Sequence, residues 1–323
     1  MAPAEFLYCP LLRVSRAIRV TAWGLLGTGV LAPALRRRVA LPRPLILGLA
    51  GAAPLAAYAV LPPRRSRTVA VCALNMWAYL AAYEMPHDDP ERLAARVHVR
   101  YPLVIDRALG LGTIPTLRLQ RAFSTPGRTN RFERLLAGCH WVWFAVPHTS
   151  VAYVLWRDPE RLARSAARMY AVFDLGAVFY WTIPTAPPWW AATRGGLRDE
   201  DLRQLRRMMI EYGPEFWGPL WEPLFKLLGG NPLAAMPSLH FATSLMGAHL
   251  LSEVGPVAGL VSWGYALMLG LALVYLGEHY AIDLIAGAAL TESVRAAAPA
   301  LAPAVKRTVA LLDVVAGRAA AGR

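Results

Sequence analysis

Residues 235–283 read AMPSLHFATSLMGAHLLSEVGPVAGLVSWGYALMLGLALVYLGEHYAID, and this stretch decides the fold. It contains two apolar segments, 237–254 and 257–276, separated by Gly255-Pro256, where a helix is expected to break. A helix rises about 1.5 Å per residue and a bilayer core is about 30 Å thick, so each segment is close to the length needed to cross it. The sequence therefore predicts a helical hairpin whose two open ends lie on the same membrane face.

The open ends of this hairpin carry two polar motifs in an otherwise apolar region. The first motif, residues 235–240, reads AMPSLH, and the second, residues 277–283, reads GEHYAID. Ionisable side chains at membrane depth are costly and are functional by default. Because the hairpin returns His240 and His279 to one face, we expect the two motifs to form a single site.

The rest of the chain is also apolar. Of its 323 residues 56% are hydrophobic and the mean hydropathy is +0.36, whereas soluble domains are usually about 45–50% apolar. The composition predicts an all-α, polytopic integral-membrane helical bundle, with about six core transmembrane helices plus one or two N-terminal helices. The expected spans are 45–61, 68–84, 134–156, 165–185, 237–254, 257–276 and 281–298, with 21–35 as a shorter eighth candidate.

The same apolar runs divide the chain into three parts. Residues 1–44 are expected to be a basic interfacial segment, 45–300 the transmembrane domain that holds both motifs, and 301–323 a C-terminal tail. Within the domain, Tyr101–Phe123 mixes apolar and charged residues and predicts a helix lying in the membrane interface. Residues 191–235 are expected to be a polar loop that leads back to the first motif.

The net charge of +13 indicates contact with anionic lipids rather than with nucleic acid. The arginines lie mainly between the spans, and the sequence holds no nucleic-acid-binding motif. The short turns at 62–67 and 157–164 are arginine-rich, and the positive-inside rule places such turns in the cytoplasm. We therefore expect a multi-pass protein of the cell membrane with both motifs on the extracytoplasmic face. Its oligomeric state stays open.

The two motifs have the residues that phosphoryl transfer needs. His279 and Asp283 are four residues apart, so on a helix the carboxylate can accept a proton from one ring nitrogen and leave the other free to attack. His240 follows Pro237 in the first turn of its helix, where free N–H groups and the helix dipole favour a phosphate. There His240 would act as general acid and Ser238 would donate a further hydrogen bond. The motifs thus predict a phosphohistidine on His279.

Other side chains near the predicted site have structural interpretations. His140, His148 and His249 lie in apolar spans without a carboxylate at helical spacing, and we interpret them as hydrogen-bonded core residues. Trp189 and Trp190 follow a proline-rich segment, where they would either anchor the chain in the interface or line an entry for lipid tails.

The two motifs resemble those of the type 2 phosphatidic acid phosphatase superfamily. Within it, the chain is most similar to the branch that contains fungal inositol phosphorylceramide synthase and its bacterial relatives. Softer similarity extends to Tyr83-Glu84-Met85-Pro86, Asp106–Gln120 and Pro184–Trp190, so the resemblance covers roughly residues 68–295. It implies a membrane-embedded helical domain and independence from a metal or other cofactor.

The resemblance also implies roles for the site residues: His279 as nucleophile, Asp283 as its partner and His240 as acid. Typical phosphatases of the superfamily carry an arginine six residues before the second histidine, where this chain has Leu273. Their upstream Lys/Arg motif is also missing, a departure shared with the headgroup-transferase branch. Since such cations hold phosphate oxygens, other residues must replace them. The candidates expected on this membrane face are Arg194, Lys226, Arg128 and Arg131.

These observations predict an integral-membrane phosphotransferase that moves a phosphate-linked headgroup, with phosphoinositol as one candidate, between lipid substrates. The nearest alternative is a lipid phosphate phosphatase acting on phosphatidate or a prenyl phosphate, in which water is the acceptor. A third reading uses His240, His279 and Asp283 as ligands of a metal-dependent hydrolase. In a fourth, the protein is a non-enzymatic lipid transporter whose buried ionisable groups bind headgroups.

Overall fold

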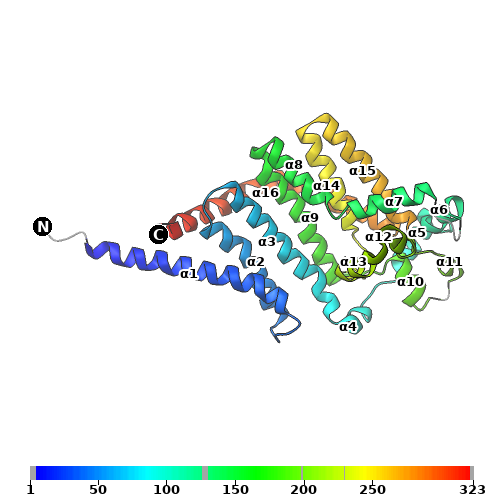
Figure 1. Cartoon of the computed structure of the whole chain (residues 1–323), viewed down its shortest axis with the longest axis horizontal. Helices are drawn as coiled ribbons and strands as arrows, with labels where there is room; N and C mark the ends of the chain where they lie inside the picture. Colours follow the sequence, from blue (N-terminus) through cyan, green and yellow to red (C-terminus); the bar gives the residue numbers. More distant parts are fainter. Residues whose placement is uncertain (1–4, 126–129, 198, 229, 321–323) are drawn as a thin grey trace. The chain divides into compact units, whose positions relative to one another are not determined.

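The structure is a computed structural model, and it consists of α-helices and short 3-10 turns, without a named strand in the residues described (Figure 1). Contacts divide the chain into two compact units, Met1–Asp88 with Ala297–Arg323, and Asp89–Ala296. Both histidine motifs lie in the second unit. The described residues are 5–125, 130–197, 199–228 and 230–320.

The first unit is built around a helix rich in small residues. Helix α2 packs against both α1 and α3, and its alanines Ala50, Ala53 and Ala57 are fully buried. Small side chains allow such close approach: a Cβ added at Gly29 of α1 would lie 2.4 Å from the carbonyl oxygen of Leu49. The elements of this unit are α1 (Glu5–Leu35), α2 (Arg43–Val60), α3 (Arg65–Glu84), η1 (Met85–Asp88) and the C-terminal part of α16 (Ala281–Ala320).

Three of the described helical segments are long and apolar enough to cross a membrane: Ser15–Leu35, Arg43–Val60 and Pro256–Tyr275. The first is longer than the expected 21–35 because α1 continues toward the N-terminus. The expected spans 68–84, 165–185, 237–254 and 281–298 correspond to α3, α9 (Leu162–Thr182), α14 (Leu239–Val254) and the first part of α16. The predicted all-helical membrane fold is confirmed.

The expected single span at 134–156 is wrong in detail. The segment forms two helices, α7 (Arg131–Val142) and α8 (Val146–Arg157), joined by a turn. Pro147 lies in the first turn of α8, where its missing N–H costs nothing but where a continuous helix would lose a hydrogen bond and clash. The break contains Trp143, whose ring lies against that of His240 in the first histidine motif.

The predicted interfacial helix Tyr101–Phe123 is also two helices, α5 (Arg100–Leu109) and α6 (Pro115–Phe123). The connection between them requires glycine: Gly112 has φ +100°, and a Cβ at Gly110 would lie 1.9 Å from the carbonyl oxygen of Thr113. The two helices can therefore fold against each other instead of lying in line.

The expected polar loop 191–235 contains helices as well. Short helices with their own buried side chains, such as Leu202 and Met208, occupy much of this stretch, so the prediction of a polar loop is wrong there. These helices are α10 (Pro188–Arg194), which begins just before the stretch, α11 (Glu200–Arg203), α12 (Met208–Trp217), η3 (Gly218–Leu220) and α13 (Trp221–Leu228). Another short helix of this unit, α4 (Pro90–Ala94), lies earlier in the chain.

The predicted hairpin forms the centre of the second unit. Figure 1 shows α14 and α15 (Pro256–Tyr275) side by side in yellow and orange, joined at Gly255. Helix α14 also packs against α8 and α9, and α15 packs against α6 and α7. The start of α16 joins them, since the hydroxyl of Thr291 donates to the carbonyl oxygen of Ala242 at 2.9 Å. The hairpin is thus held on several sides by other helices.

The tip of the hairpin lies beside the arginine-rich turn after α8, which includes η2 (Pro159–Arg161). Glu253 at the end of α14 accepts from Arg168 at 2.6 Å and Arg161 at 3.4 Å, and Arg164 lies 3.7 Å away. The histidine motifs lie at the other end of α14, about 24 Å distant for a 16-residue helix. The basic turn and the candidate site therefore occupy opposite ends of the hairpin.

Candidate active site

A tight turn between α15 and α16 presents the second histidine. Gly277 has φ +81°, and a Cβ there would lie 2.6 Å from the carbonyl oxygen of Arg206, so this turn requires glycine. The N–H groups of Glu278 and His279 both donate to the carbonyl oxygen of Leu273 at 3.1 Å. We call residues 276–280 the catalytic turn. It fixes the backbone from which the imidazole of His279 projects.

The imidazole of His279 is held between a carboxylate and a second imidazole. Its Nδ1 lies 3.2 Å from Oδ2 of Asp283, which also accepts the N–H of Tyr280 at 3.0 Å. Its Nε2 lies 3.3 Å from Nδ1 of His240. The side chain of Asp283 is fully buried and that of His279 is 5% exposed. The structure thus brings the three predicted catalytic residues into one chain of contacts.

These contacts assign protons within the chain. When Asp283 accepts from Nδ1–H of His279, the lone pair of His279 lies on Nε2, where a nucleophile is needed. Nδ1–H of His240 then donates to this lone pair. The arrangement is that of a nucleophile, an orienting carboxylate and an acid.

The ring of His240 packs between aromatic side chains of α7 and the break that follows it. The ring centroid of Trp143 lies 4.0 Å from that of His240. The ring of His140 stacks on that of His240, with centroids 5.1 Å apart and an interplanar angle of 28°. His140 was predicted to be a hydrogen-bonded core residue. It is buried as predicted, but its Nδ1 has no hydrogen-bond partner among the described residues.

Ser238 and its neighbours hold the first motif against the second. The hydroxyl of Ser238 accepts the N–H of Phe241 at 3.4 Å and so caps α14, while its own N–H donates to the backbone oxygen of Asp283 at 2.9 Å. The hydroxyl of Tyr180 donates to the carbonyl oxygen of Pro237 at 2.8 Å. The side chain of Ser238 is buried at a helix cap, so its predicted contact with phosphate stays a prediction.

Short extended segments guide the chain into the first motif. The N–H of Thr185 donates to Leu233, and the N–H of Ala235 donates back to Thr185, while His98 pairs with the segment on its other side. The hydroxyl of Tyr101 contacts Thr185 Oγ1 at 2.7 Å. The proline-rich segment before Trp189 thus serves as the middle of three paired extended segments.

Asp106 of α5 caps the helix that begins after the catalytic turn. Its carboxylate accepts the N–H groups of Ala281 and Ile282, each at 2.9 Å. A negative charge here complements the positive end of the α16 dipole. Burial raises the pKa of Asp106 to about 6, the nearby Asp283 acts in the same direction, and the two backbone donors act against it. Asp106 therefore positions the first turn of α16, which carries Asp283.

The sequence model of the PAP2 superfamily matches residues 103–296. The chain belongs to the PAP2 superfamily. This superfamily consists of phosphatases and phosphotransferases, so the protein is a membrane enzyme of the lipid phosphatase and phosphotransferase type. Searches of curated proteins and of solved structures found no match. The matched range contains Asp106, both histidine motifs and most of the second unit.

The departure from the common PAP2 pattern has a structural counterpart. Leu273, at the position of the usual arginine, is fully buried in an apolar cluster with Cys139 and Leu269. Leu273 therefore supplies no positive charge to the histidines, and the arginine of the common pattern has no counterpart at this position.

Three of the predicted cations, Arg194, Lys226 and Arg131, lie in the described part of the chain and form no hydrogen bond or ion pair with the PAP2 histidines there. Arg194 and Arg131 are exposed, and the side chain of Lys226 is 79% exposed, 3.9 Å from Glu222 on the same helix. Arg128 lies outside the described residues. Their role in phosphate binding stays a prediction.

Sequence reasoning missed Arg207, which contacts the catalytic turn directly. Its guanidinium donates from Nε to Oε1 of Glu278 at 3.0 Å and lies over the ring of Trp189, 3.6 Å from the centroid. Trp190 is buried in an apolar cluster with Leu93 and Leu233, and Trp189 packs against the same cluster. The only signal in the sequence was an arginine pair in a loop that holds several arginines, so Arg207 did not stand out.

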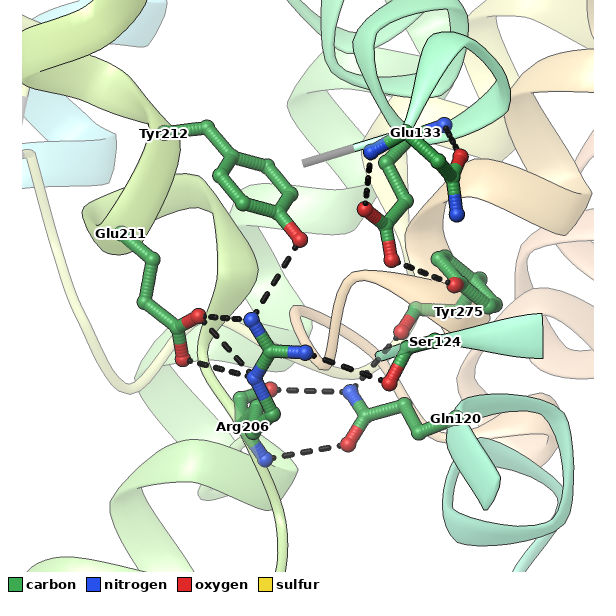
Figure 2. A network of polar contacts seen from close by, with 8 residues as sticks. Gln120, Ser124, Glu133, Arg206, Glu211, Tyr212 and Tyr275 are labelled. Atoms are coloured by element: carbon green, nitrogen blue, oxygen red, sulfur yellow. Dashed lines mark hydrogen bonds and ion pairs between the residues drawn. The ribbon is translucent and has the colours of Figure 1, made fainter. Parts of the chain in front are cut away.

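A polar network holds the Arg207 loop against the catalytic turn. Figure 2 shows the guanidinium of Arg206 among Glu211, Tyr212 and Ser124. Gln120 Nε2 donates to the carbonyl oxygens of Arg206 and Tyr275, each at 2.9 Å, and its Oε1 accepts the N–H of Arg206 at 3.0 Å. Because Gln120 holds the backbone of Arg206, the backbone position of the next residue, Arg207, is fixed as well.

The arrangement of the side chains does not support the hypothesis that His240, His279 and Asp283 are ligands of a metal ion. Among the described residues, no group of three or more His, Cys, Asp or Glu side chains is placed to hold a metal ion. His279 directs one ring nitrogen at Asp283 and the other at His240, so the three side chains form a line of contacts. A metal site would need their lone pairs to converge on one point.

Proposed function

We propose that this PAP2 protein is a phosphotransferase that moves a phosphate-linked headgroup from a lipid to an acceptor through a phosphohistidine on His279. The observation that carries the proposal is the line of contacts from Asp283 through His279 to His240. Such a line supplies a nucleophile with a fixed tautomer and an acid beside it.

In the first step, Nε2 of His279 attacks the phosphorus atom of the donor lipid. The bond from phosphorus to the leaving oxygen breaks, and His240 gives that oxygen a proton. Asp283 keeps Nδ1–H of His279 in place and stabilises the positive charge that develops on the ring. His240 gives this proton from its doubly protonated imidazolium form, so the product is a phosphohistidine that carries the headgroup, with neutral His240 beside it.

In the second step, the hydroxyl of an acceptor attacks the phosphohistidine. His240 takes the proton of this hydroxyl, the phosphorus–nitrogen bond breaks, and the lone pair returns to Nε2 of His279. With water as the acceptor, the same residues would act as a phosphatase. The burial of Leu273 in an apolar core supports transfer, because the arginine of the common phosphatase pattern has no place there.

The test compares wild-type protein with His279→Ala on labelled phosphatidylinositol, phosphatidate and a prenyl phosphate, each with and without a lipid acceptor. We expect acceptor-dependent products and an alkali-stable, acid-labile labelled protein. His279→Ala should lower the rate at least about 1000-fold, as loss of a nucleophile does. His148→Ala is the matched control, since His148 is exposed on α8 and stacks only loosely on Phe173.

Release of free phosphate without any acceptor would favour the phosphatase over the transferase. Identical product profiles from wild type and His279→Ala would contradict the catalytic assignment altogether.

A further inference from the structure

We propose that Arg207 is the phosphate-binding cation of this site, and that its pairing with Glu278 adapts the site to phosphodiesters rather than phosphomonoesters. The inference rests on the proposed function, because it names the substrate class of the same site. It assigns to a loop arginine the task that Leu273 cannot perform.

The guanidinium of Arg207 is fixed on two sides. Nε and Nη2 donate to the two carboxylate oxygens of Glu278 at 3.0 and 3.4 Å, a forked arrangement. Its flat face stacks on Trp189, and the side chains of Arg207 and Glu278 are only 27% and 14% exposed. A stacked and paired arginine is already oriented to bind a planar pair of oxygens.

This ion pair lies at the reacting residues. Glu278 is covalently next to His279, and both donate their N–H groups to Leu273. The next side chain, that of His279, contacts His240, on which His140 stacks. Arg207 forms an ion pair with the catalytic turn, and no other arginine or lysine among the described residues does so.

The partner of Arg207 indicates which phosphate fits. A carboxylate and a phosphodiester each carry one negative charge and present two oxygens to the arginine fork. Exchange of Glu278 for a phosphodiester at Arg207 therefore preserves the charge of the pair. A phosphomonoester carries a charge of about −1.5 to −2 at pH 7 and would place the excess beside the carboxylates of Glu278 and Asp283. The site thus disfavours the monoester.

The experiment measures binding by the purified full chain in detergent, by its tryptophan fluorescence, with dioctanoyl phosphatidylinositol as diester and dioctanoyl phosphatidate as monoester. We expect wild type to bind the diester more tightly. Arg207→Gln should weaken diester binding about 10- to 100-fold, the usual effect of losing hydrogen bonds between charged groups. Arg207→Lys should restore part of this loss, because it keeps the charge without the fork.

Glu278→Gln tests the selectivity, since it removes the charge that repels a monoester. We expect it to shift the affinity ratio toward phosphatidate at least about fivefold. Arg203→Gln is the matched control for Arg207→Gln. The side chain of Arg203 is 63% exposed and pairs only with Glu200 on the same short helix among the described residues, so both affinities should stay unchanged.

Two outcomes would overturn the inference: unchanged diester binding by a folded Arg207→Gln, or an unchanged affinity ratio in Glu278→Gln. The second outcome also decides the matter if Arg207→Gln fails to fold. Failure of the proposed function looks different. Wild type would then bind the diester through Arg207 but would form no phosphohistidine and transfer no headgroup.

Discussion

At the scale of single residues, Asp106 connects the protonation state of the site to its geometry. Its carboxylate holds two N–H groups at the start of α16, and burial raises its pKa to about 6. Above pH 6 the charged form accepts both hydrogen bonds, and below it the protonated form is a weaker acceptor. Asp283 directly follows Ile282, whose N–H group Asp106 holds. We therefore expect the orientation of Asp283 to depend on pH near 6.

We expect activity to fall as the pH drops through about 6, and Asp106→Asn to remove this dependence. The same change should lower the rate at high pH about 10- to 100-fold, because misplacing a catalytic group has costs of this order. The measurement is a rate profile from pH 4.5 to 8. Asp89→Asn is the control, since Asp89 caps α4, away from the histidines in sequence and contact. A profile of Asp106→Asn that matches wild type would contradict this role.

Stability should respond to Asp106 in the opposite direction. Its pKa is raised from 3.8 to about 6 on folding, so the folded protein binds the proton more tightly than the unfolded chain. This group therefore makes the protein less stable as the pH rises from about 4 to 6, while activity increases over the same range. Thermal unfolding at both pH values, compared with Asp106→Asn, measures the effect.

The site could be predicted from the sequence only where its contacts are local or follow from the hairpin. The spacing of four between His279 and Asp283 places them on one helical face, and the structure brings them together. Asp106 contacts the start of α16 from 175 residues away in the chain, and Arg207 contacts the catalytic turn from 71 residues away. No periodicity encodes such contacts, and many other arginines in the loops were equally plausible.

At the scale of elements, α7 is tied to the hairpin by one carboxylate. Glu133 forms a capping box with Asn130 at the start of α7, and its Oε1 accepts the hydroxyl of Tyr275 at 2.9 Å (Figure 2). Glu133 is fully buried. A single residue therefore both begins α7 and fixes the end of α15.

We expect Glu133→Ala to lower the free energy of unfolding by about 2–4 kcal/mol, because it removes a cap and leaves the buried Tyr275 hydroxyl without its acceptor. Arg134→Ala, one residue along, should cost less than about 1 kcal/mol, since its ion pair with Glu215 is largely exposed. Denaturant unfolding in micelles, followed by tryptophan fluorescence, compares the two. Equal losses for both variants would show that Glu133 has no special role.

Helix boundaries were predictable from the sequence where helix-breaking residues separate long apolar runs. Gly255-Pro256 stops two long apolar runs, and the hairpin forms as expected. Hydropathy stays high through Pro147, so the break between α7 and α8 was hidden although the proline was visible. The helices within 191–235 were missed because each is short and is stabilised by packing rather than by its own periodicity.

At the scale of the whole molecule, the second unit gathers arginines at the tip of its hairpin, at the end opposite to the histidines. Arg161, Arg164 and Arg168 surround Glu253 at the hairpin tip, and the histidines lie at the other end. With the positive-inside rule, this arrangement supports a site on the extracytoplasmic face.

Labelling of single cysteines in intact cells tests this orientation, after Cys9, Cys72 and Cys139 are replaced by serine or alanine. Thr193→Cys on α10 should react with a membrane-impermeant thiol reagent, and Glu160→Cys in the basic turn should react only after permeabilisation. Both positions are exposed, so burial cannot explain a difference between them. The reverse pattern would place the site in the cytoplasm.

The hairpin also separates the length of the domain from its chemistry. Both histidines lie at the open end, so a helical turn added on each side of Gly255-Pro256 would lengthen the hairpin by about 5.4 Å and leave the two rings in register. An addition to one helix alone would displace one histidine from the other. Related chains can therefore adapt to thicker or thinner bilayers by matched insertions or deletions at the tip, and we expect their length differences there rather than beside the motifs.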